Sequence, residues 1–169
     1  MKYSLLIVCL VALLLNGAVV FAGGAMGGMT HEEGRKIVQP LYDLLNGEDA
    51  AERVRANFAA DWKSFYGNGE QNFKPLDQTI GFMSGPLRQM IPDLTWEIKD
   101  VLVTGDGHVV VRGQAAGTPA GGALMGQPAA EGKSFVIMSI DIHKVVDGKV
   151  VTTHHIENWN GAFAQIRPE

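Results

Sequence analysis

The sequence predicts a single α+β domain in which helices come first and a curved antiparallel sheet follows. Two patterns lead to this prediction. Apolar residues recur with helical spacing in the first half of the chain, as far as residue 91. From residue 95 onward, strand-like runs alternate with turns that contain glycine and aspartate. A chain of this length can bury one hydrophobic core, and it contains no internal repeat.

The first 22 residues have the pattern of a secretory signal peptide. Lys2 precedes an apolar run over residues 5–15, and Ala22 supplies the small residue that a signal peptidase requires. We expect cleavage after Ala22, a periplasmic or secreted mature protein, and no membrane association after cleavage. A retained anchor is the alternative, although the apolar run is shorter than the roughly 20 residues of a spanning helix. Residues 23–29 then form a glycine-rich tether, and residues 30–169 form the folded domain.

The clearest helical segment spans residues 30–47. Thr30 and Glu33 have the spacing of a capping box at its start, and Asn46-Gly47 stops it. The apolar residues between these signals form one helical stripe, which consists of Ile37, Val38, Leu41, Leu44 and Leu45. We expect this helix to lie across the concave side of the sheet, with Leu41 and Leu45 buried.

Two further helical segments are expected before the sheet. One covers residues 50–60. The other contains Pro86, which a first helical turn accepts, and it ends at Ile91 before Pro92. Residues 61–75, between the two segments, have the mixed composition of a loop, although their aromatic side chains are too apolar to be fully exposed.

The second half of the domain predicts two hairpins. Their strands cover residues 95–103, 108–116, 134–145 and 149–158. The second hairpin turns at Asp147-Gly148, a dipeptide typical of two-residue hairpin loops. A glycine-rich segment, residues 117–132, predicts a long loop between the hairpins, and a short helix over residues 161–166 closes the chain.

Composition excludes several kinds of site. The only cysteine, Cys9, lies within the signal peptide, so the mature chain has no thiol for a disulfide, a cysteine-ligated zinc site or a nucleophile. Loss of Lys2 with the leader makes the net charge of −4 more negative by one, and the basic residues are scattered. We therefore expect no nucleic-acid partner.

Regular pairing outward from the Asp147-Gly148 turn places Asp141 opposite His154. Because alternate residues of a strand share a face, His143 and Asn158 then lie on the same side of the sheet as this pair. A carboxylate beside an imidazole fixes the tautomer of the ring and makes the histidine a competent general base. Asp141 and His154 are therefore the candidate catalytic pair.

Other interpretations of this face stay open. The carboxylate and the imidazole could form a purely structural hydrogen bond on a hydrated sheet surface. Two histidines and one aspartate could also bind iron or zinc, but neighbouring strands often produce such a set by chance, and we expect no metal. One β-bulge would reverse the faces, and His155 with Glu157 would then replace the predicted pair.

A series of short sequence pieces between Phe58 and Ile166 occurs in the order and spacing of a known family. These pieces are Pro92-Asp93-Leu94-Thr95-Trp96, Gly105-Asp106, Val109-Val110-Val111-Arg112, Gly117-Thr118, Gly126, Gly132-Lys133, Asp147-Gly148-Lys149-Val150-Val151 and Glu157-Asn158-Trp159. Together they resemble the SnoaL-like polyketide (ester) cyclases of the NTF2-like superfamily. The resemblance implies a cone, in which a curved antiparallel sheet wraps around the N-terminal helices and encloses an apolar pocket. It also implies a homodimer that pairs through the sheet.

The resemblance implies a cofactor-free reaction, the intramolecular aldol closure of a polyketide ester, in which a carboxylate removes a proton next to a carbonyl. The family's aspartate for this step lies ten residues after the glycine of Asp-Gly-Lys, where this chain has Asn158. An amide does not accept that proton, so the family's base is missing here. Pro119 and His154 are two further departures, from a frequent histidine and from a tryptophan of the family pattern.

Three hypotheses of function follow. The first is a cyclase or isomerase in which His154, oriented by Asp141, serves as the base. The second is a pocket that binds a small apolar molecule with a carbonyl group and does not turn it over. The third is an assembly module, and export fits the second and third hypotheses better than the first. The expected binding residues of the pocket are Asn158, His143, Arg112 and Trp96.

Overall fold

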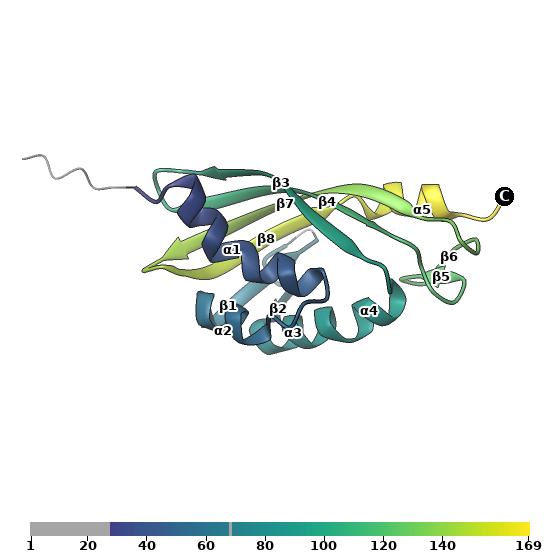
Figure 1. Cartoon of the computed structure of the whole chain (residues 1–169), viewed down its shortest axis with the longest axis horizontal. Helices are drawn as coiled ribbons and strands as arrows, with labels where there is room; N and C mark the ends of the chain where they lie inside the picture. The colour runs from purple at the N-terminus through teal and green to yellow at the C-terminus, as the bar shows by residue number, and fades with distance from the viewer. Residues whose placement is uncertain (1–27, 68) are drawn as a thin grey trace, which may run out of the picture.

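The computed structural model describes residues 28–67 and 69–169 (Figure 1). The predicted signal peptide and most of the tether lie outside the described residues, so cleavage and export stay predictions. Within the described ranges, no helix combines the length and the apolar character that crossing a bilayer requires.

Helices and strands form a mixed α+β domain, as the sequence predicts. The helices are α1 (His31–Leu45), α2 (Ala51–Asn57), α3 (Leu76–Ser84), α4 (Pro86–Met90) and α5 (Trp159–Ile166). The strands are β1 (Phe58–Tyr66), β2 (Phe73–Pro75), β3 (Thr95–Val103), β4 (His108–Gly117), β5 (Ala123–Leu124), β6 (Gln127–Pro128), β7 (Phe135–Val146) and β8 (Lys149–Glu157).

Six of the strands form one curved sheet in the order β2-β1-β8-β7-β4-β3 (Figure 1). Neighbouring strands are antiparallel except β1 and β8, which run parallel. Helices α1 to α4 cover one face of the sheet, called the inner face below, and α5 lies at the end where the chain finishes. Strands β5 and β6 form a small separate hairpin within the predicted long loop.

Helix α1 confirms the predicted N-terminal helix and its buried stripe. The Thr30 hydroxyl accepts the Glu33 N–H at 3.2 Å, and the Glu33 carboxylate accepts the Thr30 N–H at 2.7 Å, which completes the capping box. Leu41 and Leu45 are only 4% and 5% exposed. Their burial against the sheet anchors α1 across its inner face (Figure 1).

A proline lies inside α1 and leaves one backbone carbonyl without its usual donor. Pro40 has no N–H, so the Lys36 carbonyl four residues earlier lacks its helical hydrogen bond. The side-chain amide of Asn57, the last residue of α2, donates to this carbonyl at 3.4 Å and to the neighbouring Ile37 carbonyl at 3.0 Å. One asparagine therefore supplies the donor that the proline removes and ties α2 to α1.

Strand β1 corrects the prediction for residues 58–66, which were divided between a helix and a loop. Its buried residues, Phe58, Trp62 and Ser64, lie two or four positions apart, but the apolar Ala60 between them is exposed and Ser64 is polar. Ala60 lies where the pairing of β1 with β8 shifts, between Phe58 and Lys63. Because apolar and polar residues do not alternate along β1, the sequence lacks the usual signal of a half-buried strand.

The β7–β8 hairpin begins in the predicted register and then departs from it. The register shifts by one residue near the start of β8, where Val151 has no partner on β7. Such a bulge exchanges the two faces of the strand beyond it. As a result Asp141 lies opposite His155, and the predicted pairing with His154 is wrong.

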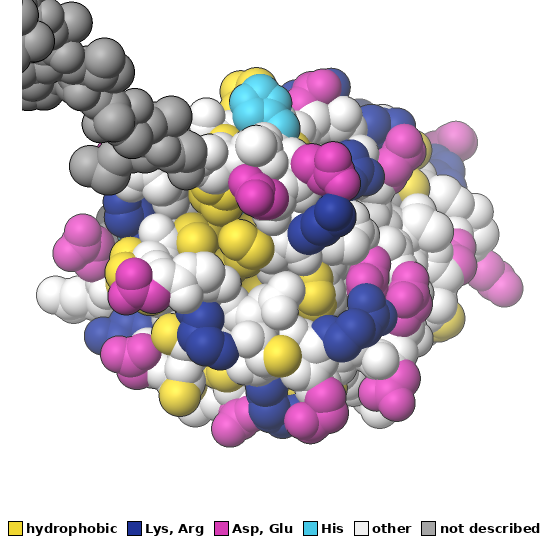
Figure 2. Space-filling model, turned by 60° about the vertical axis from the view of Figure 1, so that its left-hand side comes forward, with side chains coloured by type: hydrophobic (Ala, Val, Ile, Leu, Met, Phe, Trp, Pro, Cys, Tyr) yellow, Lys and Arg dark blue, Asp and Glu magenta, His cyan; other side chains and the backbone are white. Residues whose placement is uncertain are grey.

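The surface of the domain carries mixed charges and one apolar region. Acidic and basic side chains are intermixed over the face seen in Figure 2. On the outer face of the sheet, several large apolar residues of β7 and β8 are exposed, namely Val136, Met138, Ile142 and Ile156.

Candidate functional site

A cavity of about 470 Å³ lies between the inner face of the sheet and the helices that cover it. Most of its lining is apolar, with aromatic and sulfur-containing side chains from several elements: Tyr66, Phe82, Met83, Met90, Trp96 and Trp159. Four polar side chains of β7 and β8 also reach it, Asp141, Thr153, His155 and Glu157. A cavity of this size, apolar with a few polar groups on one wall, is typical of a site for a small organic molecule.

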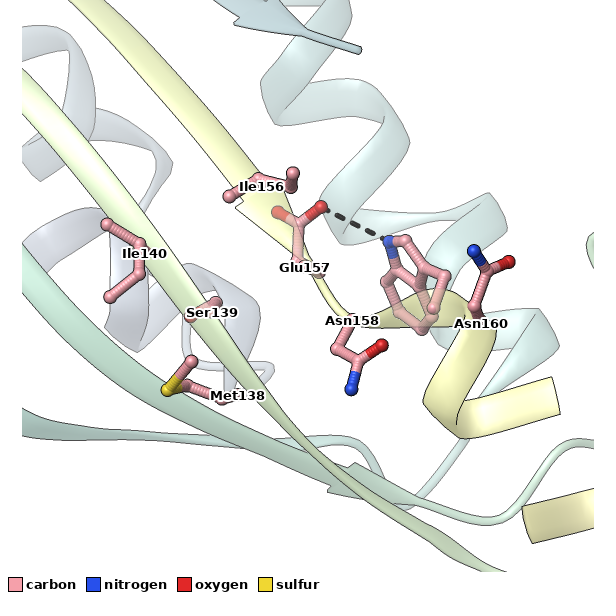
Figure 3. A pocket seen from close by; sticks show the side chains of 8 residues that line it. Met138, Ser139, Ile140, Ile156, Glu157, Asn158 and Asn160 are labelled. Carbon is pink, nitrogen blue, oxygen red and sulfur yellow. Dashed lines mark hydrogen bonds between the residues drawn. The ribbon is translucent and has the colours of Figure 1, made fainter. Parts of the chain in front are cut away.

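Three titratable side chains meet at the polar wall. His155 Nδ1 lies 2.6 Å from Glu157 Oε1. The Trp159 indole donates to Glu157 Oε2 at 3.2 Å, the dashed line in Figure 3. Asp141 pairs with His155 across the two strands, as the bulge requires. Both oxygens of Glu157 are thus occupied, whereas Asp141 Oδ2 is buried and has no hydrogen-bond partner among the described residues.

Burial dominates the protonation of Asp141. Loss of water around the carboxyl raises its pKa to about 7, and the negative charge of Glu157 acts in the same direction. The charge of His155 and the nearby Tyr42 and Ser139 hydroxyls oppose this rise. Near neutral pH, the carboxyl therefore exists in both forms and can accept or donate a proton.

The two neighbours of Asp141 form a charge pair of their own. Burial lowers the pKa of His155, but the hydrogen bond and the charge of Glu157, with the charge of Asp141, outweigh burial and raise it above the usual value. The positive charge of Lys74 acts with burial against protonation. The imidazolium form of His155 is therefore more stable than in a free histidine, and the Glu157 carboxylate can neutralise its charge.

A buried chain of polar groups supports this wall from behind. His143 Nε2 lies 3.1 Å from the Tyr42 hydroxyl, and its Nδ1 lies 2.8 Å from the Thr153 hydroxyl. Trp62 donates its indole N–H to the same Thr153 oxygen at 3.0 Å. Burial lowers the pKa of His143 to about 3, so the ring is neutral and can donate at one nitrogen and accept at the other. His143 thus faces inward but belongs to the packed layer and does not line the cavity.

The bulge moves the predicted catalytic histidine away from the cavity. His154 is exposed on the outer face, where its ring stacks on Phe65 with centroids 4.6 Å apart and an angle of 8° between the planes. Asp141 lies on the inner face and lines the cavity. The predicted contact of Asp141 with His154 inside the cone is therefore wrong, and His155 occupies the place expected for His154.

Of the predicted binding residues, Trp96 lies in the cavity and Arg112 does not. Trp96 lines the cavity and donates its indole N–H to the Ser139 hydroxyl at 3.1 Å. Arg112 is exposed on the outer face and forms an ion pair with Asp100, because even-numbered residues of β4 point away from the helices. Its predicted position in the pocket is wrong.

Asn158, which the sequence resemblance assigned to the family's acid/base position, has a structural contact. Its side-chain oxygen accepts the Gly161 N–H at 3.0 Å and caps the start of α5. The residue lines a second, shallower pocket of about 380 Å³ where β8 leaves the sheet (Figure 3). Glu157 and Trp159 line both pockets, but Asn158 does not line the larger cavity, so its predicted position there is wrong.

The same wall contains a group of side chains that could hold a metal ion, namely Asp141, His155 and Glu157. Each offers one ligand atom, and these atoms lie within 4.8 Å of one another. However, His155 and Glu157 already bond to each other, and a protonated imidazole cannot ligate a metal. The arrangement fits proton transfer better than metal binding.

Several residues that line the cavity or lie directly behind its polar wall were not predicted as part of a site. His155 and Glu157 appeared only as the substitutes that a bulge would bring inward, because nothing in the sequence marks the extra residue. Tyr42 follows Leu41 on the buried side of α1, where its hydroxyl gives no signal distinct from the apolar stripe. Lys74 lies in the segment expected to be a loop.

Comparisons with known proteins agree with this architecture. The family model of SnoaL-like polyketide cyclases matches residues 36–166. A structure from Jannaschia sp. CCS1, provisionally assigned as a SnoaL-like polyketide cyclase, is 19% identical, with a TM-score of 0.67 over 82% of this chain and 94% of that one. A search of curated proteins returned no match.

Two further structures extend the comparison. IdmH of Streptomyces antibioticus, provisionally assigned as a polyketide cyclase, is 25% identical, with a TM-score of 0.64 over 78% of this chain and 96% of that one. A protein from Catenulispora acidiphila with a ketosteroid isomerase-like fold, solved with trimethylamine, is 17% identical, with a TM-score of 0.60 over 79% of this chain and 94% of that one.

Proposed function

Because the chain belongs to the SnoaL-like polyketide cyclase family, we propose that it binds a small apolar carbonyl compound in the inner cavity and removes a proton next to the carbonyl. Asp141 is the proposed base. One observation carries this proposal: the carboxyl of Asp141 lines an apolar cavity, has a pKa of about 7, and has one oxygen that accepts no hydrogen bond from any described residue. A group of that pKa is suited to moving protons at neutral pH.

In the proposed reaction, the ionised Asp141 takes a proton from the carbon next to a carbonyl, and the C–H electron pair forms an enolate. In a cyclisation, the enolate carbon attacks a second carbonyl carbon of the same molecule, and its oxygen becomes an alkoxide. The protonated Asp141 then returns its proton to that alkoxide. In an isomerisation, the proton returns to a different carbon of the enolate. Either route regenerates the carboxylate.

The protonated His155 stabilises the negative charge that appears during these steps. It lies beside Asp141 on the neighbouring strand, and Glu157 holds its ring in place through Nδ1. A positive group fixed in a water-poor cavity attracts a developing enolate more strongly than it would in water. The apolar lining supplies the rest of the binding energy by burying the carbon skeleton of the ligand.

Deuterium exchange with a trial ketone tests the proposal. The probe is 2-tetralone, an apolar bicyclic ketone with acidic C–H groups next to its carbonyl, followed by NMR in D₂O. We expect the protein to accelerate exchange, and Asp141→Asn to slow it about 100-fold or more. The rate should rise with pH through about 7 and then level off, because only the carboxylate acts as a base. Asn158→Ala is the matched control and should leave exchange unchanged.

A second function, ligand binding without turnover, has one observation in its favour. The residue at the family's acid/base position is an asparagine that caps a helix. The same experiment separates the two functions, because saturation-transfer NMR detects bound 2-tetralone whether or not it exchanges. Binding without exchange would favour the ligand-binding function, and exchange that survives Asp141→Asn would contradict Asp141 as the base.

A further inference from the structure

Lys74 brings a positive charge to the cavity, and no carboxylate in residues 28–67 or 69–169 forms an ion pair with it. Its side chain lines the cavity, and the ammonium lies 3.9 Å from the centre of the Tyr66 ring and 5.4 Å from that of Phe82. None of the ion pairs formed by the described residues includes Lys74. Aromatic faces attract a cation, but they do not satisfy the three N–H donors of an ammonium as oxygen acceptors would.

The sheet fixes Lys74 on this wall. Strand β2 pairs with β1 so that Lys74 lies directly opposite Ser64, a buried residue that also lines the cavity. Residues opposite each other on paired strands share a face of the sheet. The direction of the lysine therefore follows from the register and the two rings that hold its ammonium.

The acidic side chains that line the cavity, Glu157 and Asp141, do not pair with the Lys74 ammonium. His155 engages one oxygen of Glu157. The Trp159 indole engages the other (Figure 3). Asp141 is 6% exposed and lies on β7, beyond β1 and β8 from the edge strand that carries Lys74. The pair of His155 and Glu157 is neutral overall, so together with Lys74 the described lining has no net negative charge even when Asp141 is ionised.

We propose that Lys74 binds an anionic oxygen of the ligand, so that the cavity selects apolar molecules that carry a carboxylate or a similar acidic group. This deepens the proposed function, on which it rests, by naming a charge that the ligand must have. The apolar skeleton lies among the aromatic side chains, and the anionic group meets the ammonium at the β2 edge. A lysine provides a point charge of this kind without the fixed geometry that an arginine imposes.

Two fluorescent dyes that differ by one anionic group provide the test. N-phenyl-1-naphthylamine is neutral, and 8-anilino-1-naphthalenesulfonate has the same ring system with a sulfonate added. We expect the protein to prefer the sulfonate, and Lys74→Met to weaken its binding about tenfold, the loss of one charge-assisted contact. Binding of the neutral dye should stay within about twofold, which also reports that the cavity is intact.

Lys63 supplies the matched control. It lies on the neighbouring strand with its ammonium 4.9 Å from the centre of the Phe73 ring, but it is exposed and does not line the cavity. Lys63→Met should leave the binding of both dyes unchanged. Lys74→Arg should retain the preference for the sulfonate, and Lys74→Gln repeats the test if the methionine variant does not fold.

Each outcome decides one question. If the wild-type protein binds the neutral dye but does not prefer the sulfonate, the anion site is wrong and the apolar ligand site stands. If Lys63→Met lowers sulfonate binding as much as Lys74→Met, the preference reflects surface charge and the inference is overturned. If the wild-type protein binds neither dye, the proposed ligand site itself fails, and the inference fails with it.

Discussion

The Asp141 carboxyl is buried, and its Oδ2 accepts no hydrogen bond from the described residues. Both properties affect its acid–base chemistry and the stability of the fold. A buried acceptor without a partner lowers stability, and the cost increases when the carboxyl ionises. Proteins retain such groups where function requires them. The nearby Tyr42, His143 and Thr153 form hydrogen bonds with one another, so among the described residues of this wall the unpaired acceptor is the Asp141 carboxyl.

The raised pKa of Asp141 predicts an unusual dependence of stability on pH. Between pH 3.8, the ordinary pKa of an aspartate, and about 7, the folded protein holds a proton that the unfolded chain has released. Its contribution to stability is complete below that range and is lost as pH rises through about 7, at about 1.4 kcal/mol for each pH unit crossed. Asp141→Asn should remove this loss.

Urea unfolding at pH 5 and pH 8 checks this prediction. The quantity to compare is the unfolding free energy of Asp141→Asn minus that of the wild-type protein. This difference should be more positive at pH 8 than at pH 5 by a few kcal/mol. Asp106, whose exposed carboxyl has its pKa lowered to about 2 by hydrogen bonds, is the control, because Asp106→Asn should not reproduce the effect. If the stability difference between wild type and Asp141→Asn is the same at both pH values, Asp141 does not titrate as described.

At the residue scale, sequence reasoning placed side chains only where the strand register was regular. Asp141 and Trp96 face the cavity as predicted, because β7, β4 and the start of β3 pair in an even alternation. His154 and Asn158 lie beyond the bulge and were assigned to the wrong face. No characteristic residue type marks this bulge, so the register beyond it could not be predicted from the sequence.

At the scale of elements, Pro40 and Asn57 form a unit that can be tested by mutation. Asn57→Ala removes the donor to the carbonyls of Lys36 and Ile37, and we expect the free energy of unfolding to fall by about 1–2 kcal/mol. Asn57→Asp, which keeps the shape but has no N–H donor, should cost at least as much. Chemical unfolding of purified variants measures both.

A double-mutant cycle shows whether the proline is the cause. Pro40→Ala restores a backbone N–H for the Lys36 carbonyl, so Asn57→Ala should cost less in that background. An equal cost in both backgrounds would mean that Asn57 contributes through packing between α1 and α2 and not through the carbonyl that the proline leaves free.

Elements with strong local signals were predicted closely, and those with weak signals were not. The predicted strand over 95–103 matches β3 at both ends, and the capping box fixes the start of α1. Strand β1 was missed because apolar and polar residues do not alternate along it: the apolar Ala60 is exposed and the polar Ser64 is buried. Tertiary contacts with β8, not local propensity, hold those nine residues in a strand.

At the scale of the whole molecule, the outer face of the sheet predicts association. Ile156 is 67% exposed and Met138 is 52% exposed, close to each other on β8 and β7. Apolar side chains grouped on one sheet face are typical of an interface, and two copies related by a two-fold axis would cover the same patch on each. We expect a homodimer that pairs through this face.

Sedimentation velocity at micromolar concentration checks the dimer. Ile156→Lys and Met138→Glu should shift the protein to a monomer, because each would bury an unpaired charge at the interface. Val146→Lys, an equally simple change of an exposed apolar residue at the hairpin tip, should leave the dimer in place. A wild-type protein that sediments as a monomer would contradict the prediction.

The single unpaired residue of β8 has a consequence for how relatives of this chain are compared. A homologue that is one residue shorter at Val151 would keep every side chain beyond that point and yet present the other set to its ligand: histidine at the His154 position and isoleucine at the Ile156 position. The chemistry of the cavity is therefore encoded partly in strand length. In this hairpin the placement of a gap carries as much functional information as the identity of a residue, and a one-codon deletion would exchange the His155–Glu157 pair for a histidine and an isoleucine beside Asp141 in a single evolutionary step.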